Sequence, residues 1–199
     1  RIWIELFRRI GRKYPVSVYI WEEGLKIAKR EGLKEVKYIL WSAKRWTKFR
    51  FFINYIARII IAVVKSLNLT VNNQPSTIIY SASEFWQDTF PSVILKLRYP
   101  AITWIASWYQ TAPNPFLGYK ERGKLRFLPD LRSLAYWLTQ QPVKPLIKKY
   151  ADFVFVTSEP DTVHFPKQES KNKVIVIKGG VVLEKIRSFL DHRSKIKDL

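Results

Sequence analysis

The sequence predicts an α/β fold in which a parallel sheet is flanked by helices. Short runs rich in β-branched and aromatic residues alternate along the chain with stretches of helical periodicity. The 199 residues suffice for one such domain with a real core, and they are too few for two domains of ordinary size. Cysteine is absent and histidine occurs only twice, which excludes disulfides and cysteine-ligated metals and argues against a multi-histidine metal site.

The first elements follow one another without long loops. A helical pattern at residues 1–14, RIWIELFRRIGRKY, leads into a strand at 15–21, PVSVYIW. A short helical piece at 23–30 precedes a strand at 35–41, EVKYILW. A helix at 43–69 then ends at the turn-rich sequence TVNNQPS.

The second half of the chain repeats this alternation. The β-branched residues of TIIYSAS mark a buried strand, and a Pro- and Gly-containing loop follows the next strand, AITWIAS. The expected elements are strands at 77–83, 101–107, 152–158 and 173–180 and helices at 88–98 and 130–150. Strands separated by helices imply parallel β-α-β units with right-handed crossovers, so we expect a Rossmann-like parallel sheet.

The helix at 43–69 raises the question of a membrane. A helix that spans a bilayer needs about 20 consecutive, mostly apolar residues. Arg50, Arg58 and Lys65 interrupt this stretch, so we do not expect it to span. When residues are placed at 100° per step, most apolar side chains fall in one broad arc, and Lys44, Lys48, Arg58 and Lys65 gather opposite.

Two roles are open for that apolar arc. It can cover the sheet, as most such helices do, or it can lie on a membrane surface, and both hold if the helix sits at the edge of the domain. We expect the core role to bury Phe52, Ile56, Ile59, Ile60 and Val63 against the sheet. The N-terminal end would then remain for an anionic membrane surface through Lys44, Arg45, Trp46, Lys48 and Arg50.

Polar junctions follow four of the predicted strands. Ligands of open parallel sheets bind beyond the carboxyl ends of the strands, so these junctions predict a cleft along one edge. The candidate substrate-binding residues are Ser83, Glu84, Ser107, Trp108, Tyr109, Ser158, Glu159, Lys178, Gly179 and Gly180. Taken one by one, each position also fits ordinary loop and helix-capping chemistry.

Three segments resemble a known enzyme family. IIYSASEFWQDTFPSVIL resembles the segment after the fourth strand in the N-terminal domain of family 4 retaining glycosyltransferases. ADFVFVTSEPD and then NKVIVIKGGVVLEKI resemble the later pattern of that family, in which a strand ending in Ser precedes a strand ending in a turn. The resemblance covers most of the chain.

The resemblance implies an enzyme of the GT-B type, with two Rossmann-like domains that move a sugar from a nucleotide-sugar to an acceptor. Residues 1–199 would form the N-terminal, acceptor-binding domain, without its first strand and without the donor domain, so we do not expect this chain alone to transfer sugar. No catalytic residue is assigned. Neither metal nor cofactor is expected, because cations, backbone N–H groups and helix N-termini can stabilise the departing diphosphate. The implied partners are a nucleotide-sugar donor and a sugar or lipid-linked acceptor.

The charge of the chain bears on its partners. With 35 basic and 16 acidic side chains the formal net charge is +19, which favours polyanions or an anionic membrane. Many relatives of the resembled family act on lipid-linked acceptors, so we expect a cytoplasmic protein that is peripheral on the inner face of the cell membrane.

Two other functional classes remain open. A nucleic-acid-binding module could use the same basic charge with aromatic stacking, although no RNP-like, helix-turn-helix or zinc-finger signature is present. Another Rossmann-type nucleotide-sugar enzyme, such as an epimerase or dehydrogenase, needs a Gly-x-Gly-x-x-Gly turn, which the sequence lacks.

Overall fold

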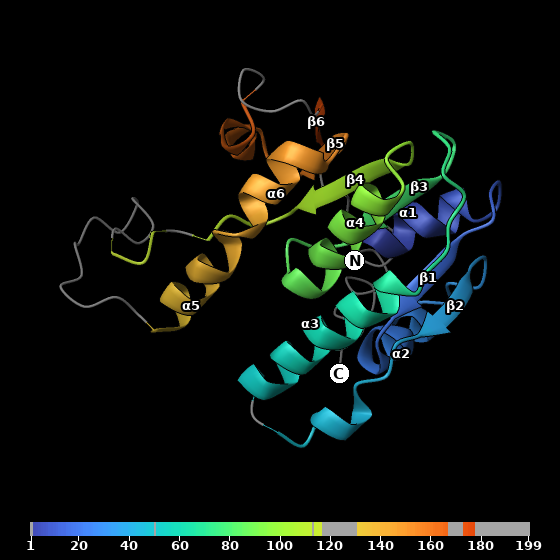
Figure 1. The fold of residues 1–199 in the computed structure, drawn as a ribbon, viewed down its shortest axis with the longest axis horizontal. Coiled ribbons are helices and arrows are strands. Elements are labelled where there is room, and N and C mark those ends of the chain that lie inside the picture. The colour runs from blue at the N-terminus through green and yellow to red at the C-terminus, as the bar shows by residue number, and fades with distance from the viewer. Residues whose placement is uncertain (1, 50, 113, 117–130, 167–172, 178–199) are drawn as a thin grey trace, which may run out of the picture.

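The computed structural model describes residues 2–49, 51–112, 114–116, 131–166 and 173–177, in which helices and strands alternate as the sequence predicts (Figure 1). The strands are β1 (Ser17–Ile20), β2 (Lys37–Leu40), β3 (Ile78–Ser81), β4 (Thr103–Trp108), β5 (Phe153–Val156) and β6 (Lys173–Val176). The α-helices are α1 (Ile2–Ile10), α2 (Glu22–Arg30), α3 (Phe51–Leu67), α4 (Trp86–Arg98), α5 (Leu131–Gln140) and α6 (Val143–Tyr150). Two short 3₁₀ helices are η1 (Lys44–Trp46) and η3 (Glu159–His164).

The described strands are all parallel, and they form two sheets. β1 pairs with β2, while β3, β4, β5 and β6 pair in that order. The α/β class with parallel strands flanked by helices is therefore confirmed. The described strands are divided between two sheets, because β1 pairs only with β2 and β3 only with β4.

The main core lies between the four-stranded sheet and the helices α4 and α6. Side chains of a strand alternate between its two faces, and every second residue of β4 therefore points at these helices. The fully buried members of this core, each no more than 1% exposed, include Trp104, Ala106, Trp108, Val143, Ile147, Val154 and Val156. Burying one such aliphatic or aromatic side chain contributes about 1.5 to 3 kcal/mol, so the packing fixes the strand ends on a rigid platform.

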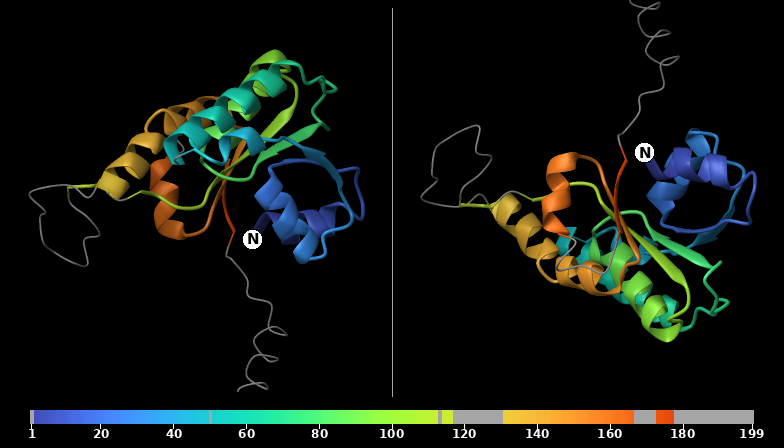
Figure 2. Two further views of the ribbon diagram at one scale, coloured as in Figure 1. Left: turned by 90° about the horizontal axis from the view of Figure 1, so that it is seen from below. Right: turned by 90° about the horizontal axis from the view of Figure 1, so that it is seen from above.

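The other side of the sheet meets the N-terminal elements (Figure 2). The ring of Phe7 in α1 lies 5.5 Å from the ring of Tyr80 in β3, and Tyr80 in turn contacts Phe155 in β5. The α1–β1–α2–β2 region also has a small core of its own around Val18 and Ile20. The N-terminal region is thus a separate layer that contacts the larger sheet through aromatic rings.

Helix α3 faces its neighbours with a side that the sequence pattern does not predict. Its buried residues are the small ones, Ala57, Ala62 and Ser66, and they allow close packing against α4. The expected burial of the apolar arc is wrong for three of its five members: Phe52, Ile56 and Ile60 are exposed, while Ile59 and Val63 are partly buried. The reason is that α3 packs mainly on another helix, for which small side chains suffice.

The predicted helix at 130–150 is two helices. α5 ends at Gln140, and α6 begins at Val143 after Pro142, whose ring cannot provide the N–H that a continuous helix needs. The break allows Val143 and Ile147 to turn into the main core. None of the helices in the described part of the chain is long and apolar enough to cross a membrane.

Candidate functional site

Hydrogen bonds join the ends of β3, β4 and β5 at one edge of the larger sheet. The backbone N–H of Tyr109, after β4, points at the carboxylate of Glu84, after β3, across 3.5 Å. The hydroxyl of Thr157, after β5, donates to the backbone carbonyl of Tyr109 over 2.9 Å. Since parallel strands end at the same edge, three of the polar junctions named from the sequence meet here.

Glu84 is a buried carboxylate, only 4% exposed, at the centre of this edge. A buried carboxylate is costly unless hydrogen bonds satisfy it. The hydroxyl of Tyr136 in α5 supplies such a bond over 2.7 Å. Gln140, in the same helix, holds the chain after β4: its amide donates to the carbonyl of Gln110 and accepts from the N–H of Ala112. Helix α5 thereby closes over the strand ends.

A second carboxyl group lies beside Glu84. The hydroxyl of Ser83 donates to Asp88, in the first turn of α4, over 2.5 Å. Burial raises the pKa of Asp88, the hydrogen bond from Ser83 partly opposes this, and the nearby Glu84 charge adds to it, so that the resulting pKa is about 6. This edge therefore holds one carboxyl group whose protonation changes near neutral pH.

The ends of β4 and β5 are connected through Asp161 in η3. Its carboxylate accepts from the hydroxyl of Ser158 over 2.6 Å and from that of Thr111 over 3.0 Å. The Thr111 oxygen in turn accepts the indole N–H of Trp108 over 2.8 Å. These contacts fix the loops after both strands, so the polar edge is a preformed surface.

The residues named from the sequence occupy different environments. Ser83, Glu84, Tyr109 and Ser158 belong to the connected edge described above. Ser107 and Trp108 are 0% and 1% exposed, so their side chains belong to the core and offer no surface to a ligand. The hydroxyl of Tyr109 pairs with that of Tyr80. Glu159 is exposed at the start of η3. Lys178, Gly179 and Gly180 lie outside the described residues.

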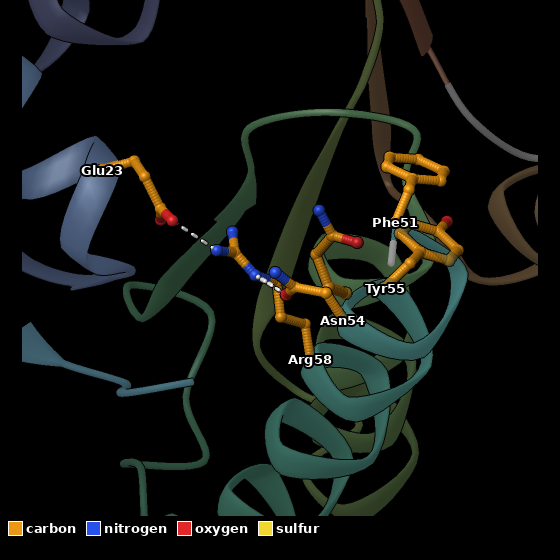
Figure 3. A pocket seen from close by; sticks show the side chains of 6 residues that line it. Glu23, Phe51, Asn54, Tyr55 and Arg58 are labelled. Carbon is orange, nitrogen blue, oxygen red and sulfur yellow. Dashed lines mark hydrogen bonds and ion pairs between the residues drawn. The ribbon is translucent and has the colours of Figure 1, made fainter. Parts of the chain in front are cut away.

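A pocket of about 340 Å³ opens beside this edge (Figure 3). Its lining comes from three helices: Glu23 from α2, Phe51, Asn54, Tyr55 and Arg58 from α3, and Gln87 from α4. Helix α2 begins just after β1 ends, and α4 begins after β3. The pocket therefore lies beyond the carboxyl ends of strands from both sheets, which is the usual position for a ligand in parallel α/β proteins.

Arg58 organises the polar wall of the pocket. Its guanidinium donates to Glu23 over 2.7 Å and to Asn54 over 2.8 Å, and both side chains point toward it in Figure 3. The same guanidinium lies 5.3 Å from the ring of Trp21. These contacts hold the carboxylate, amide and guanidinium groups in fixed positions around the opening.

The opposite wall combines an aromatic pair with an amide. The rings of Phe51 and Tyr55 are stacked, with centroids 5.9 Å apart. The hydroxyl of Tyr55 accepts the backbone N–H of Trp86, and burial raises the pKa of this phenol. The side-chain oxygen of Gln87 is buried and has no hydrogen-bond partner among the described residues. An acceptor without a partner at the wall of a pocket can receive a hydroxyl group from a ligand.

The pocket is the part of the site that the sequence did not reveal. Its residues are scattered over three helices and share no motif. Glu23 follows the carboxyl end of β1, so applying the strand-end rule to the first strand would have found it. Asn54 and Arg58 are four residues apart on α3, and they contact one another directly.

The predicted membrane-surface residues are exposed where the structure describes them. Lys44, Arg45, Trp46 and Lys48 lie on the surface in and after η1, and Arg50 lies outside the described residues. The ring of Trp46 packs beside that of Phe49, with centroids 5.7 Å apart. Among the described residues no group of three or more acidic or histidine side chains could hold a metal ion.

The fold and the site define a parallel α/β domain with a hydrogen-bonded polar edge and an adjoining pocket at its strand ends. Comparison with protein family models, with curated proteins and with solved structures finds no match.

Proposed function

We propose that this chain is the acceptor-binding domain of a retaining glycosyltransferase that moves a sugar from a nucleotide-sugar to an acceptor. The observation that carries the proposal is the chemistry of the pocket, which combines a carboxylate, two amides, a guanidinium group and an aromatic pair. Sugar hydroxyls both donate and accept hydrogen bonds, so they match this mixture better than a purely apolar ligand does.

The residues suggest separate roles toward a sugar acceptor. The unpartnered oxygen of Gln87 would accept a hydrogen bond from one hydroxyl. Asn54 and Glu23, both held by Arg58, would bind neighbouring hydroxyls. The ring of Phe51 is well exposed and would cover the apolar face of a sugar ring.

The other parts of the proposal follow from the family resemblance and the charge. Donor binding and the chemistry of transfer belong to a second domain, as in the family that the sequence resembles. The net charge of +19 and the exposed cations of η1 favour association with an anionic membrane, where the chain would bind a lipid-linked acceptor at the cytoplasmic face. The exposed cations Lys44, Arg45 and Lys48 would also attract the anionic headgroup linker of such an acceptor.

Saccharide binding to the purified chain tests the proposal. Methyl and octyl glycosides of common hexoses are titrated, and saturation-transfer NMR reports binding. Replacing Gln87 with Ala removes one hydrogen bond and should weaken binding about tenfold. Gln74→Ala is the matched control, because Gln74 is exposed in the loop between α3 and β3 and does not line the pocket, and it should bind as the parent does.

Two results would contradict the proposal. The first is the absence of saturation transfer from any of the glycosides to the folded chain. The second is equal binding by the parent and by Gln87→Ala, which would exclude the pocket as the site. Binding of a nicotinamide dinucleotide that Gln87→Ala weakens would instead indicate the dehydrogenase or epimerase class.

A further inference from the structure

The outward side of α3 is an apolar surface that no other described part of the chain covers. Its members recur at the spacing of one helical face, and each is between 46% and 64% exposed. We define the α3 outer face as Phe52, Ile53, Ile56, Ile60, Val64 and Leu67. At 1.5 Å per residue this row is about 22 Å long. An exposed apolar row of this length normally marks an interaction surface.

Cations stand at both ends of the α3 outer face. Lys44, Arg45 and Lys48 are exposed at its N-terminal end, and Lys65 is exposed near its C-terminal end. The sequence from 44 to 67 contains no aspartate or glutamate. Basic residues around an apolar helix face are the pattern that binds anionic bilayers.

Two aromatic side chains extend the row at its basic end. Trp46 and Phe49 are both more than 40% exposed, and the ammonium group of Lys48 lies 5.5 Å from the ring of Phe49. Tryptophan with nearby lysine is typical of the boundary between lipid headgroups and acyl chains. The same segment thus carries apolar groups suited to acyl chains, aromatic groups suited to the headgroup boundary and cations suited to anionic headgroups.

A second copy of the chain fits this face less well than a bilayer does. Pairing two α3 outer faces would bring their flanking cations together with no acidic residue in the segment to offset them. The net charge of +19 adds repulsion between copies. An anionic bilayer would instead attract both the flanking cations and the positively charged chain as a whole.

We propose that α3 lies flat on an anionic bilayer, with its outer face inserted below the headgroups and the cations of η1 among them. The inference rests on the membrane location in the proposed function and specifies the surface that makes the contact. It extends the contact from the N-terminal end of the segment to the whole helix. Four pocket residues, Phe51, Asn54, Tyr55 and Arg58, belong to this same helix, so the pocket would open beside the membrane.

Vesicle flotation tests the apolar part of the proposal. The parent chain should float with vesicles of phosphatidylcholine mixed with phosphatidylglycerol, and far less with phosphatidylcholine alone. Ile56→Asn combined with Ile60→Asn should reduce binding at least about tenfold, because two inserted side chains are lost. Ile27→Asn combined with Leu97→Asn changes two exposed apolar residues on α2 and α4 and should leave binding unchanged.

A fluorescent label reports insertion of the α3 outer face without the polar substitutions used in the flotation test. The chain has no cysteine, so Ile60→Cys can be labelled at one position with the environment-sensitive dye NBD. Its emission should rise and shift to the blue when anionic vesicles are added. The same label at Ile27→Cys, on α2, should not respond.

Each alternative outcome overturns the proposal. Unchanged flotation of the double asparagine variant, or an NBD label at residue 60 that stays in water, would show that α3 does not insert. Release of the chain from vesicles by single-stranded RNA, with RNA binding that needs Ile56 and Ile60, would assign the face to nucleic acid. Self-association without lipid that the double variant abolishes would assign it to a second copy.

Saccharide binding separates this proposal from the proposed function. Gln87→Ala should lose glycoside affinity and keep vesicle binding, because its side chain is not part of the α3 outer face. Vesicle binding without any glycoside binding would therefore leave the α3 inference standing while the sugar assignment fails.

Discussion

The hydroxyl of Tyr136 donates a 2.7 Å hydrogen bond to the carboxylate of Glu84, which is only 4% exposed. Tyr136 belongs to α5 and Glu84 follows β3, so this one bond ties a helix from the second half of the chain to an earlier strand end. A hydrogen bond to a charged group is stronger than one between neutral groups. The pair therefore has a measurable role in holding α5 over the strand ends.

Removing the Tyr136 hydroxyl should destabilise the fold. Tyr136→Phe leaves the Glu84 carboxylate buried with one donor fewer, and we expect the free energy of unfolding to fall by about 1.5 to 3 kcal/mol. Urea denaturation followed by circular dichroism measures the change. Tyr14→Phe, at a residue 64% exposed, is the control and should have almost no effect.

Asp88 should make stability depend on pH in an unusual direction. Its carboxyl is buried, which raises its pKa from 3.8 to about 6. The folded state then binds the proton more tightly than the unfolded state, so this contribution is fully present below pH 3.8 and is lost as pH rises through 6. At about 1.4 kcal/mol per pH unit, the loss amounts to at most about 3 kcal/mol.

The comparison with Asp88→Asn isolates this effect from other titrating groups. The variant cannot ionise and keeps an oxygen that can accept from Ser83. The unfolding free energy of the parent, taken relative to the variant, should therefore fall as the pH rises from about 4 to about 7. A parallel pH profile for the two proteins would show that Asp88 titrates normally.

At the amino-terminal ends of the strands, Asp152 stabilises the larger sheet from its position just before β5. Its carboxylate accepts from the ammonium group of Lys96 at 2.8 and 3.1 Å and from the backbone N–H of Trp104 over 2.7 Å. Asp152→Ala should lower the free energy of unfolding by about 2 to 3 kcal/mol, because the N–H of Trp104 loses its acceptor and Lys96 loses its carboxylate partner, although Lys96 keeps the carbonyl of Ile102. Asp152→Asn keeps one acceptor oxygen and should lose less. Equal losses in the two variants would attribute the effect to charge instead of to hydrogen bonding.

The order of strands and helices could be predicted because it depends on local patterns. Runs such as TIIYSAS and DFVFVTS contain the β-branched and aromatic residues that parallel strands need on both faces. Once the strands are parallel, their carboxyl ends share an edge, so Ser83, Glu84 and Tyr109 could be grouped in advance. The helix expected at 130–150 is instead divided at Pro142, and the ring of this one residue accounts for the break.

The direction in which α3 faces could not be predicted from its own periodicity. The pattern defines an apolar arc, but it does not say which neighbour the helix will meet. Contact with α4 uses Ala57, Ala62 and Ser66, because small side chains let two helices approach closely. The pocket escaped prediction for a related reason: Glu23, Asn54 and Gln87 come together only after three helices have packed.

The division into two sheets has a consequence for how the molecule opens. In the described chain β1 and β2 pair only with each other, and a two-stranded sheet is marginally stable by itself. Few fully buried residues support it, whereas the larger sheet has a core centred on Trp104 and Val154. We expect local unfolding of the N-terminal layer to precede global unfolding. Amide hydrogens of Val18 and Ile20 should then exchange with deuterium sooner than those of Ala106 and Val154. The Arg58–Glu23 ion pair joins α3 to α2, so its removal should speed exchange at Val18 and Ile20 further and widen that difference.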